Sequence, residues 1–206
     1  MQKVSIASTT ELHHELQYHG VLFSRWGREG TTKPFSKLLQ NIQNGEMELW
    51  SDGTQLLYKT RRAQLVILSR IKREHAFLRE EKVFHNGLTV SPSEHYSMRE
   101  KLKFLHGETA LEGCVRGLGE ELQLFNVDPA MFIPLYEDEG IVHDSRSFPG
   151  LLSQTHKTTF LWMMPEELVK RKYVEHCEYC VSRFTWGKVP AHIASLCKPH
   201  LKKRAA

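Results

Sequence analysis

The sequence predicts an α+β fold, in which helices pack on a mixed β-sheet. Three observations support this prediction. Short apolar segments of strand length precede one amphipathic helical segment, further strand-like segments follow it, and a helical segment closes the chain. The chain has 206 residues, of which 40% are hydrophobic and 25% charged, so one domain with peripheral additions can bury a core without disulfides.

The first part of the chain predicts a helix and a hairpin. Residues 34–42 place a proline in the first helical turn and apolar side chains at helical spacing. Residues 47–50 and 55–60 form strand-like segments around Ser51-Asp52-Gly53-Thr54, a sequence typical of tight turns. We expect residues 1–60 to be an N-terminal extension that packs on the core.

The core is expected to follow this extension. Apolar or alternating segments predict strands at 63–69 and 76–84, and then near 131–136, 158–163 and 179–186. These strands surround the central helix, so we expect a domain over residues 61–190 and a basic helical tail over residues 191–206. The polar segments 85–100 and 137–150 exceed the usual length of a connection, which makes them candidate binding loops.

Residues 107–123 carry the clearest helical pattern in the chain. Apolar side chains follow the i, i+3, i+4 period and predict one buried stripe: Ala110, Leu111, Cys114, Val115, Leu118 and Leu122. The charged side chains are expected on the opposite face: Glu108, Glu112, Arg116, Glu120 and Glu121. Adjacent carboxylates at Glu120 and Glu121 are oxygen ligands that suit Mg²⁺ or Mn²⁺. The alternative is a solvated face stabilised by ion pairs around Arg116.

This helical segment resembles the Nudix box, G-x5-E-x7-R-E-U-x-E-E-x-G-U, in which U is an aliphatic residue. The positions that match in register are Glu108, Arg116, Leu118, Glu120, Glu121 and Leu124. The positions that depart are Leu102 and Gln123, in place of glycines, and Gly117, in place of the glutamate after the arginine. Four flanking segments are also similar to a eukaryotic branch of Nudix-domain proteins: 96–103, 144–153, 164–167 and 184–186. The resemblance as a whole covers residues 62–188.

The resemblance implies a Nudix-type hydrolase that uses Mg²⁺ or Mn²⁺ to cleave a pyrophosphate linkage in a substrate linked to a nucleoside diphosphate. It assigns Glu120 and Glu121 as metal ligands, Arg116 as the residue that orients a glutamate, and Glu108 as a support at the helix start. Gly117 supplies no carboxylate, and the candidate replacements are Glu112, Asp144 and the segment Glu137-Asp138-Glu139. The alternative is a catalytically weak or inactive Nudix-fold module that binds a nucleotide or RNA.

A second metal site is suggested by spacing near the C-terminus. Cys177, Cys180, Cys197 and His200 form a C-x2-C-x16-C-x2-H pattern, which is typical of structural zinc ligands. The alternative is that these are small buried cysteines.

Charge and composition indicate which classes of partner, and which cellular compartment, to expect for this protein. The formal net charge of +4 fits a phosphate-bearing small molecule and leaves RNA as a second candidate. No apolar stretch is long enough to span a bilayer, so no membrane is expected. The N-terminal segment lacks the apolar centre of a signal peptide. We therefore expect an intracellular protein in the cytoplasm, with an organelle as the alternative.

Overall fold

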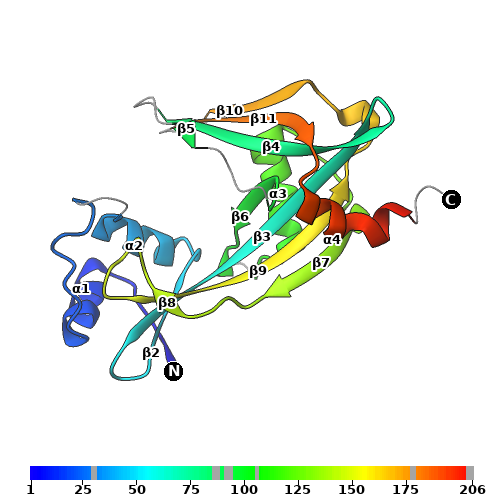
Figure 1. Ribbon diagram of the computed structural model, residues 1–206. Coiled ribbons are helices and arrows are strands. Elements are labelled where there is room, and N and C mark those ends of the chain that lie inside the picture. Colours follow the sequence, from blue (N-terminus) through cyan, green and yellow to red (C-terminus); the bar gives the residue numbers. More distant parts are fainter. Residues whose placement is uncertain (29–31, 85–88, 91–94, 105–106, 177–179, 203–206) are drawn as a thin grey trace. The chain divides into compact units, whose positions relative to one another are not determined.

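The computed structural model describes residues 1–28, 32–84, 89–90, 95–104, 107–176 and 180–202 (Figure 1). The chain forms two compact units. The first unit contains residues 1–62, 101–109 and 138–157, and the second contains residues 63–100, 110–137 and 158–206. The α+β class predicted from the sequence is confirmed, with helices and a large sheet in one chain.

The first unit contains two helices and short antiparallel pairings. Its elements are α1 (Thr9–Tyr18), α2 (Phe35–Gln43), β1 (Gln2–Val4), β2 (Glu48–Ser51), β8 (His143–Asp144) and the first parts of β3 (Leu56–Ile71) and β9 (Leu152–Met163). β2 pairs with β1 and with β3, and β8 pairs with β9. The predicted hairpin is therefore present. The two strands expected at 55–60 and 63–69 form one continuous strand, β3.

Helix α1 lies in a segment for which the sequence analysis expected no helix. A capping box begins it: Glu11 N donates to Ser8 Oγ at 3.2 Å, and Ser8 N donates to Glu11 Oε2 at 3.1 Å. Leu12 and Leu16 are fully buried in the core of the first unit. These two leucines are the only buried side chains of the ten-residue helix, so its amphipathic pattern is weak in the sequence.

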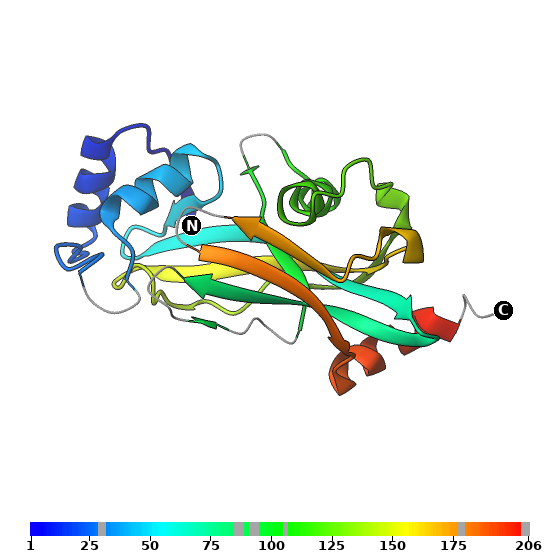
Figure 2. The ribbon, with the colours of Figure 1, turned by 90° about the horizontal axis from the view of Figure 1, so that it is seen from above.

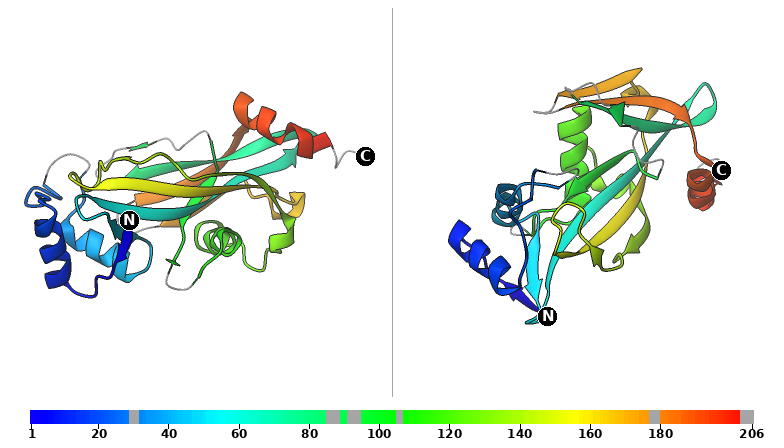
Figure 3. Two further views of the ribbon diagram at one scale, coloured as in Figure 1. Left: turned by 90° about the horizontal axis from the view of Figure 1, so that it is seen from below. Right: turned by 60° about the vertical axis from the view of Figure 1, so that its left-hand side comes forward.

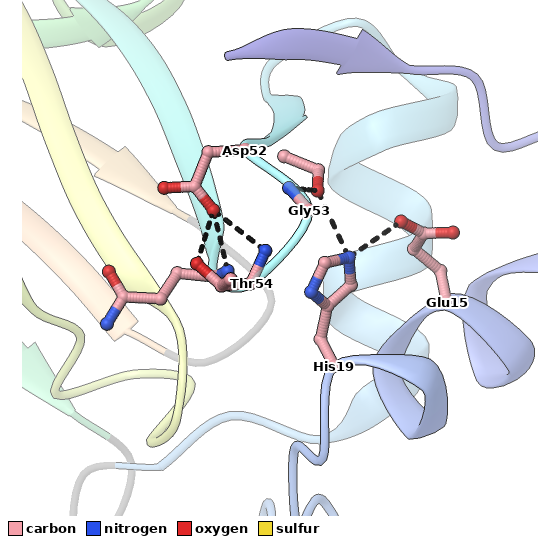
Figure 4. Close-up of polar contacts among 7 residues, drawn as sticks. Glu15, His19, Asp52, Gly53 and Thr54 are labelled. Carbon is pink, nitrogen blue, oxygen red and sulfur yellow. Dashed lines mark hydrogen bonds and ion pairs between the residues drawn. The ribbon is translucent and has the colours of Figure 1, made fainter.

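The hairpin turn between β2 and β3 is held by Asp52 (Figure 4). Asp52 Oδ1 accepts hydrogen bonds from Gln55 N at 2.8 Å, Thr54 N at 2.9 Å and Thr54 Oγ1 at 2.8 Å. These donors, the backbone amide of Gln55 first, lower the pKa of Asp52 to about 2. Gly53 has a φ of +92°, a conformation that favours glycine.

Figure 4 also shows how α1 is joined to this hairpin. His19 Nε2 lies 3.2 Å from Glu15 Oε1 and 3.1 Å from Ser51 Oγ. Both contacts use the same ring nitrogen. A Ser-His-acid relay needs the acid on the other nitrogen, so this group links two elements and is not a nucleophilic triad.

The second unit is a sheet with helices on both faces. Its elements are β4 (Glu74–Phe84), β5 (Thr89–Val90), β6 (Met98–Lys101), α3 (Ala110–Leu122), the 3-10 turns Pro129–Met131 and Glu166–Leu168, β7 (Phe132–Asp138), β10 (Lys172–His176), β11 (Cys180–Lys188), α4 (Ala191–Lys202) and the second parts of β3 and β9. β4 pairs antiparallel with β11, and β11 with β10. Figures 2 and 3 show α3 and α4 on opposite sides of these strands.

The side chains of β4 alternate between these two faces. Phe77 is buried against Ile193 and Cys197 of α4. Leu78 and Glu80 point to the other face, the side on which α3 packs beside β10. The segment expected as a basic tail thus contributes α4, whose apolar side chains belong to the core of this unit.

No helix among the described residues combines the length and the apolar character that crossing a membrane requires.

Candidate active site

Helix α3 carries three of the four predicted site residues, Arg116, Glu120 and Glu121, in the second unit. The apolar stripe is buried as predicted at Cys114, Leu118 and Leu122. Glu121 was expected on the exposed charged face, and that expectation is wrong: its side chain lies on the buried face and is 8% exposed. By spacing, position 121 continues the buried stripe, and only its acidic side chain had suggested exposure.

Arg116 joins two carboxylates that come from different elements. Its Nη1 donates to Glu120 Oε2 at 3.0 Å, four positions along α3, and to Glu100 Oε2 of β6 at 2.8 Å. The side chain of Glu120 is 55% exposed, whereas that of Glu100 is only 14% exposed. Because a buried carboxylate loses hydration, the charged hydrogen bond from Arg116 to Glu100 matters most for holding the site together.

Glu121 is the most perturbed acid of this site. Burial, followed by the negative charges of Glu100 and Glu80, raises the pKa of Glu121 to about 10. Burial also raises the pKa of Glu100, which Arg116 opposes, and a hydrogen bond joins the carboxyl groups of Glu100 and Glu121. The Oε2 atom of Glu121 is buried and accepts no hydrogen bond among the described residues. A buried carboxylate oxygen with no donor is unusual and suits a cation.

The sheet contributes further acids to the face that α3 covers. Glu80 accepts a hydrogen bond from Ser182 Oγ at 3.1 Å and forms an ion pair with Lys82 Nζ at 2.8 Å. Burial of Lys82 lowers its pKa, but the contact with Glu80 outweighs that effect, so the net shift is upward. Burial raises the pKa of Glu175, which pairs with Ser182 across the sheet. The site thus carries more acidic than basic groups.

Glu108 belongs to the first unit, unlike the other three predicted site residues. Its Oε2 accepts a hydrogen bond from Lys103 N at 2.8 Å, and its own N–H donates to Lys103 O at 3.2 Å. These two bonds join Glu108, two positions before α3, to Lys103. The role that the resemblance assigns to Glu108, a support at the helix start, stays a prediction.

Sequence reasoning did not identify Glu80, Glu100 or Glu175. Glu100 lies in a segment that was expected to be a loop, 85–100, which contains β5 and β6 and whose residues 85–88 and 91–94 lie outside the described part. Sixteen positions separate Glu100 from Arg116, and no spacing rule connects a strand residue to a helix at that distance. Of the carboxylate candidates named from the sequence, Glu112 lies on α3 itself. Asp138 and Asp144 lie in the first unit, where Asp138 forms an ion pair with Lys157 at 3.1 Å.

The predicted zinc ligands are not gathered into one site by the described residues. Cys180 pairs with Phe84 at one end of β4, whereas Cys197 packs in the cluster that contains Phe77. At ~3.3 Å per residue, seven positions of β4 span roughly 23 Å. Cys197 is fully buried, and burial raises its pKa to about 11. Cys177 lies outside the described residues, and His200 lies one turn after Cys197 on α4.

Comparisons with known proteins give structural similarities only. No family model matches the chain, and no curated protein matches it. The chain is similar to the Nudix domain of Shewanella oneidensis NrtR complexed with ADP ribose, at 15% identity and a TM-score of 0.41, over 79% of this chain and 97% of that one. It is similar to an Ap4A hydrolase from C. elegans in a binary complex, at 14% identity and a TM-score of 0.36, over 71% and 98%. It is also similar to the Nudix hydrolase RenU from M. smegmatis, at 12% identity and a TM-score of 0.37, over 76% and 94%. All three TM-scores lie below 0.5, so these similarities assign no function to the chain.

Proposed function

We propose that this protein is a divalent-metal-dependent, Nudix-type hydrolase that cleaves a pyrophosphate linkage in a substrate linked to a nucleoside diphosphate. Glu120 and Glu121 are the proposed metal ligands, and the metal is Mg²⁺ or Mn²⁺. The observation that carries the proposal is the Oε2 atom of Glu121, which is buried among other acids and accepts no hydrogen bond from any residue that the structure describes. The Nudix-box register of Glu108, Arg116, Glu120 and Glu121 supports the same function.

The residues of the site fit a hard divalent cation that shares its ligands with a substrate. Among the residues that the structure describes, no three histidine, cysteine or acidic side chains are grouped closely enough to hold a metal ion by themselves. Mg²⁺ is usually held by one or two carboxylates, together with water and substrate phosphates. Glu121 and one neighbouring carboxylate are therefore sufficient on the protein side.

Each side chain of the site has a distinct task in this proposal. A bound divalent cation supplies charge neutralisation at the phosphoryl oxygens and a more acidic water. Arg116 holds Glu100 and Glu120 in fixed positions through one hydrogen bond to each carboxylate. Glu121 projects from the buried face of α3 and accepts the cation in place of a proton. Glu120, on the exposed side of the helix, faces water and substrate.

The test is phosphate release from a panel of nucleoside diphosphate derivatives, with Mg²⁺ or Mn²⁺ present. We expect metal-dependent turnover by the wild-type protein and a loss on the order of 100-fold or more in Glu121→Gln. The matched control is Glu81→Gln, which removes one carboxylate from the opposite face of β4 and should keep full activity. Silence of the wild-type protein across the panel would contradict the proposal.

A second candidate function is a nucleotide- or RNA-binding module without turnover. It is favoured by a pocket of about 220 Å³ in the first unit, lined by Lys59, Arg61, Phe104 and His156 among others. Arg61 lies 5.6 Å from the centre of the Phe104 ring, and cationic and aromatic side chains together suit phosphates and bases. Binding of a nucleotide or short RNA without metal, lost in Arg61→Ala and accompanied by no turnover, would support this function.

A further inference from the structure

The space beside Gly117 is filled by a glutamate from another element. A Cβ atom added at Gly117 would lie 2.5 Å from Glu100 Cγ and 3.1 Å from Glu100 Cδ. It would also lie 2.5 Å from Cε of Met98, the flexible end of that side chain. The stem and carboxyl carbon of Glu100 therefore occupy the volume that a side chain at position 117 would need.

Glu100 is fixed in this space by two contacts. Arg116 Nη1 donates to its Oε2 at 2.8 Å, and its carboxyl group is hydrogen-bonded to that of Glu121. Two buried carboxylates in contact repel each other when both are ionised, and a cation between them removes the repulsion. Among the described residues, the buried Oε2 of Glu121 has no hydrogen-bond partner, which is an independent indication that a ligand binds at this point.

We propose that Glu100, which reaches from β6 against Gly117, supplies the metal-site carboxylate that α3 lacks and grips the cation together with Glu121. This inference rests on the proposed function and adds a residue to it. The carboxylate enters from a strand, and a glycine on the helix is required because the side chain from β6 takes its place. Positions 117 and 100 are thus coupled, because a side chain at 117 would need the space that the stem of Glu100 occupies.

The first test is the affinity of the full-length protein for Mn²⁺, measured by electron paramagnetic resonance of free Mn²⁺ without substrate. We expect Glu100→Gln to weaken Mn²⁺ binding on the order of 10- to 100-fold, the loss typical even for residues that only hydrogen-bond to metal ligands. Glutamine keeps the shape of the side chain and an acceptor for Arg116, so the fold is retained. Glu81→Gln, on the other face of the sheet, is the matched control and should bind as the wild type does.

The second test exchanges the two positions. Glu100→Ala should bind Mn²⁺ more weakly than the wild type. Glu100→Ala combined with Gly117→Glu should bind Mn²⁺ at least tenfold more tightly than Glu100→Ala alone, because the carboxylate then comes from the helix. Mn²⁺ affinity in Glu100→Gln within twofold of the wild type, or a folded double variant that regains nothing, overturns the inference. If Glu100→Gln does not fold, the double variant decides.

The two proposals fail in different ways. If Glu121→Gln abolishes Mn²⁺ binding while Glu100→Gln leaves it intact, the assignment of Glu100 is wrong and the proposed metal-dependent function stands. If the wild-type protein binds no Mn²⁺, with or without a nucleoside diphosphate, the proposed function itself is overturned.

Discussion

Arg116 Nη1 donates to Oε2 of Glu100 at 2.8 Å and so ties helix α3 to strand β6 in the second unit. The same nitrogen reaches Glu120 one turn along the helix, at 3.0 Å. A single guanidinium therefore sets the positions of one largely buried and one exposed carboxylate. The proposed metal site depends on this arrangement, because its acids repel one another without a cation.

The first prediction concerns this pair. Arg116→Ala leaves the carboxylate of Glu100 without its charged donor, and we expect a loss of about 1.5–3 kcal/mol in the free energy of unfolding. Urea denaturation measures this loss. Arg183→Ala, an exposed arginine on the other face of β11, is the control and should cost about 0.5 kcal/mol or less. Equal costs for the two variants would contradict the structural role of Arg116.

The second prediction is a pH dependence of stability caused by Glu121. Its pKa is about 10 in the folded protein against an ordinary 4.5, so the folded state holds a proton that the unfolded chain releases. The contribution of Glu121 to the free energy of unfolding is fully present below about pH 4.5, and it declines as the pH rises towards 10. Glu121→Gln cannot ionise, so without metal it should gain stability relative to the wild type as pH rises. Chemical denaturation at several pH values, with a chelator present, measures this; parallel profiles would contradict it.

The third prediction concerns the close approach at Gly117. Alanine in a helix is favoured over glycine by ~1 kcal/mol, but the added Cβ would lie 2.5 Å from Glu100 Cγ, and overpacking costs about 1–3 kcal/mol. We expect Gly117→Ala to destabilise the wild-type protein and to be stabilising when Glu100 is already alanine. A thermal-denaturation cycle of the single and double variants measures this change of sign. A stabilised Gly117→Ala single variant would show that the space is free.

The fourth prediction addresses the core of the first unit. Ser145 Oγ lies 2.9 Å from Tyr58 Oη and accepts a hydrogen bond from Phe148 N at 2.9 Å. Ser145→Ala leaves both groups without this partner in a buried setting, so we expect a loss of about 1–3 kcal/mol. Ser147→Ala, two positions along the same segment, is the matched control and should have a small effect in the same urea titration. A negligible cost for Ser145→Ala would mean that water replaces the hydroxyl.

Local sequence signals predicted several elements well. The Asp52-Gly53 turn, the helix after Pro34 and the amphipathic helix that ends at Leu122 depend on neighbours within a few residues, and each is present. Helix α1 was missed because its capping box is local but its apolar stripe is short. The burial of Glu121 was missed for another reason: a glutamate on a buried stripe contradicts the ordinary preference of this residue for an exposed position.

The partners of the site could not be predicted in the same way. Glu100 meets Gly117 because β6 pairs with β3 and α3 packs on the same unit, and these contacts are set by the tertiary fold. The contact of Glu80 with Ser182 likewise joins β4 to β11 across 102 positions of the chain, whereas Glu175 and Ser182 lie on consecutive strands. The glycine at 117 was visible in the sequence as a departure from the Nudix box. The side chain that fills its place was not.

The most direct measurement of the central claim is a crystal structure of the protein with Mn²⁺ and a non-hydrolysable nucleoside diphosphate derivative, recorded at a wavelength that locates manganese by anomalous scattering. We expect an anomalous peak roughly 2.0–2.3 Å from a carboxylate oxygen of Glu121, with phosphate oxygens completing the shell. A diphosphate bound elsewhere, with no manganese at Glu121, would contradict it.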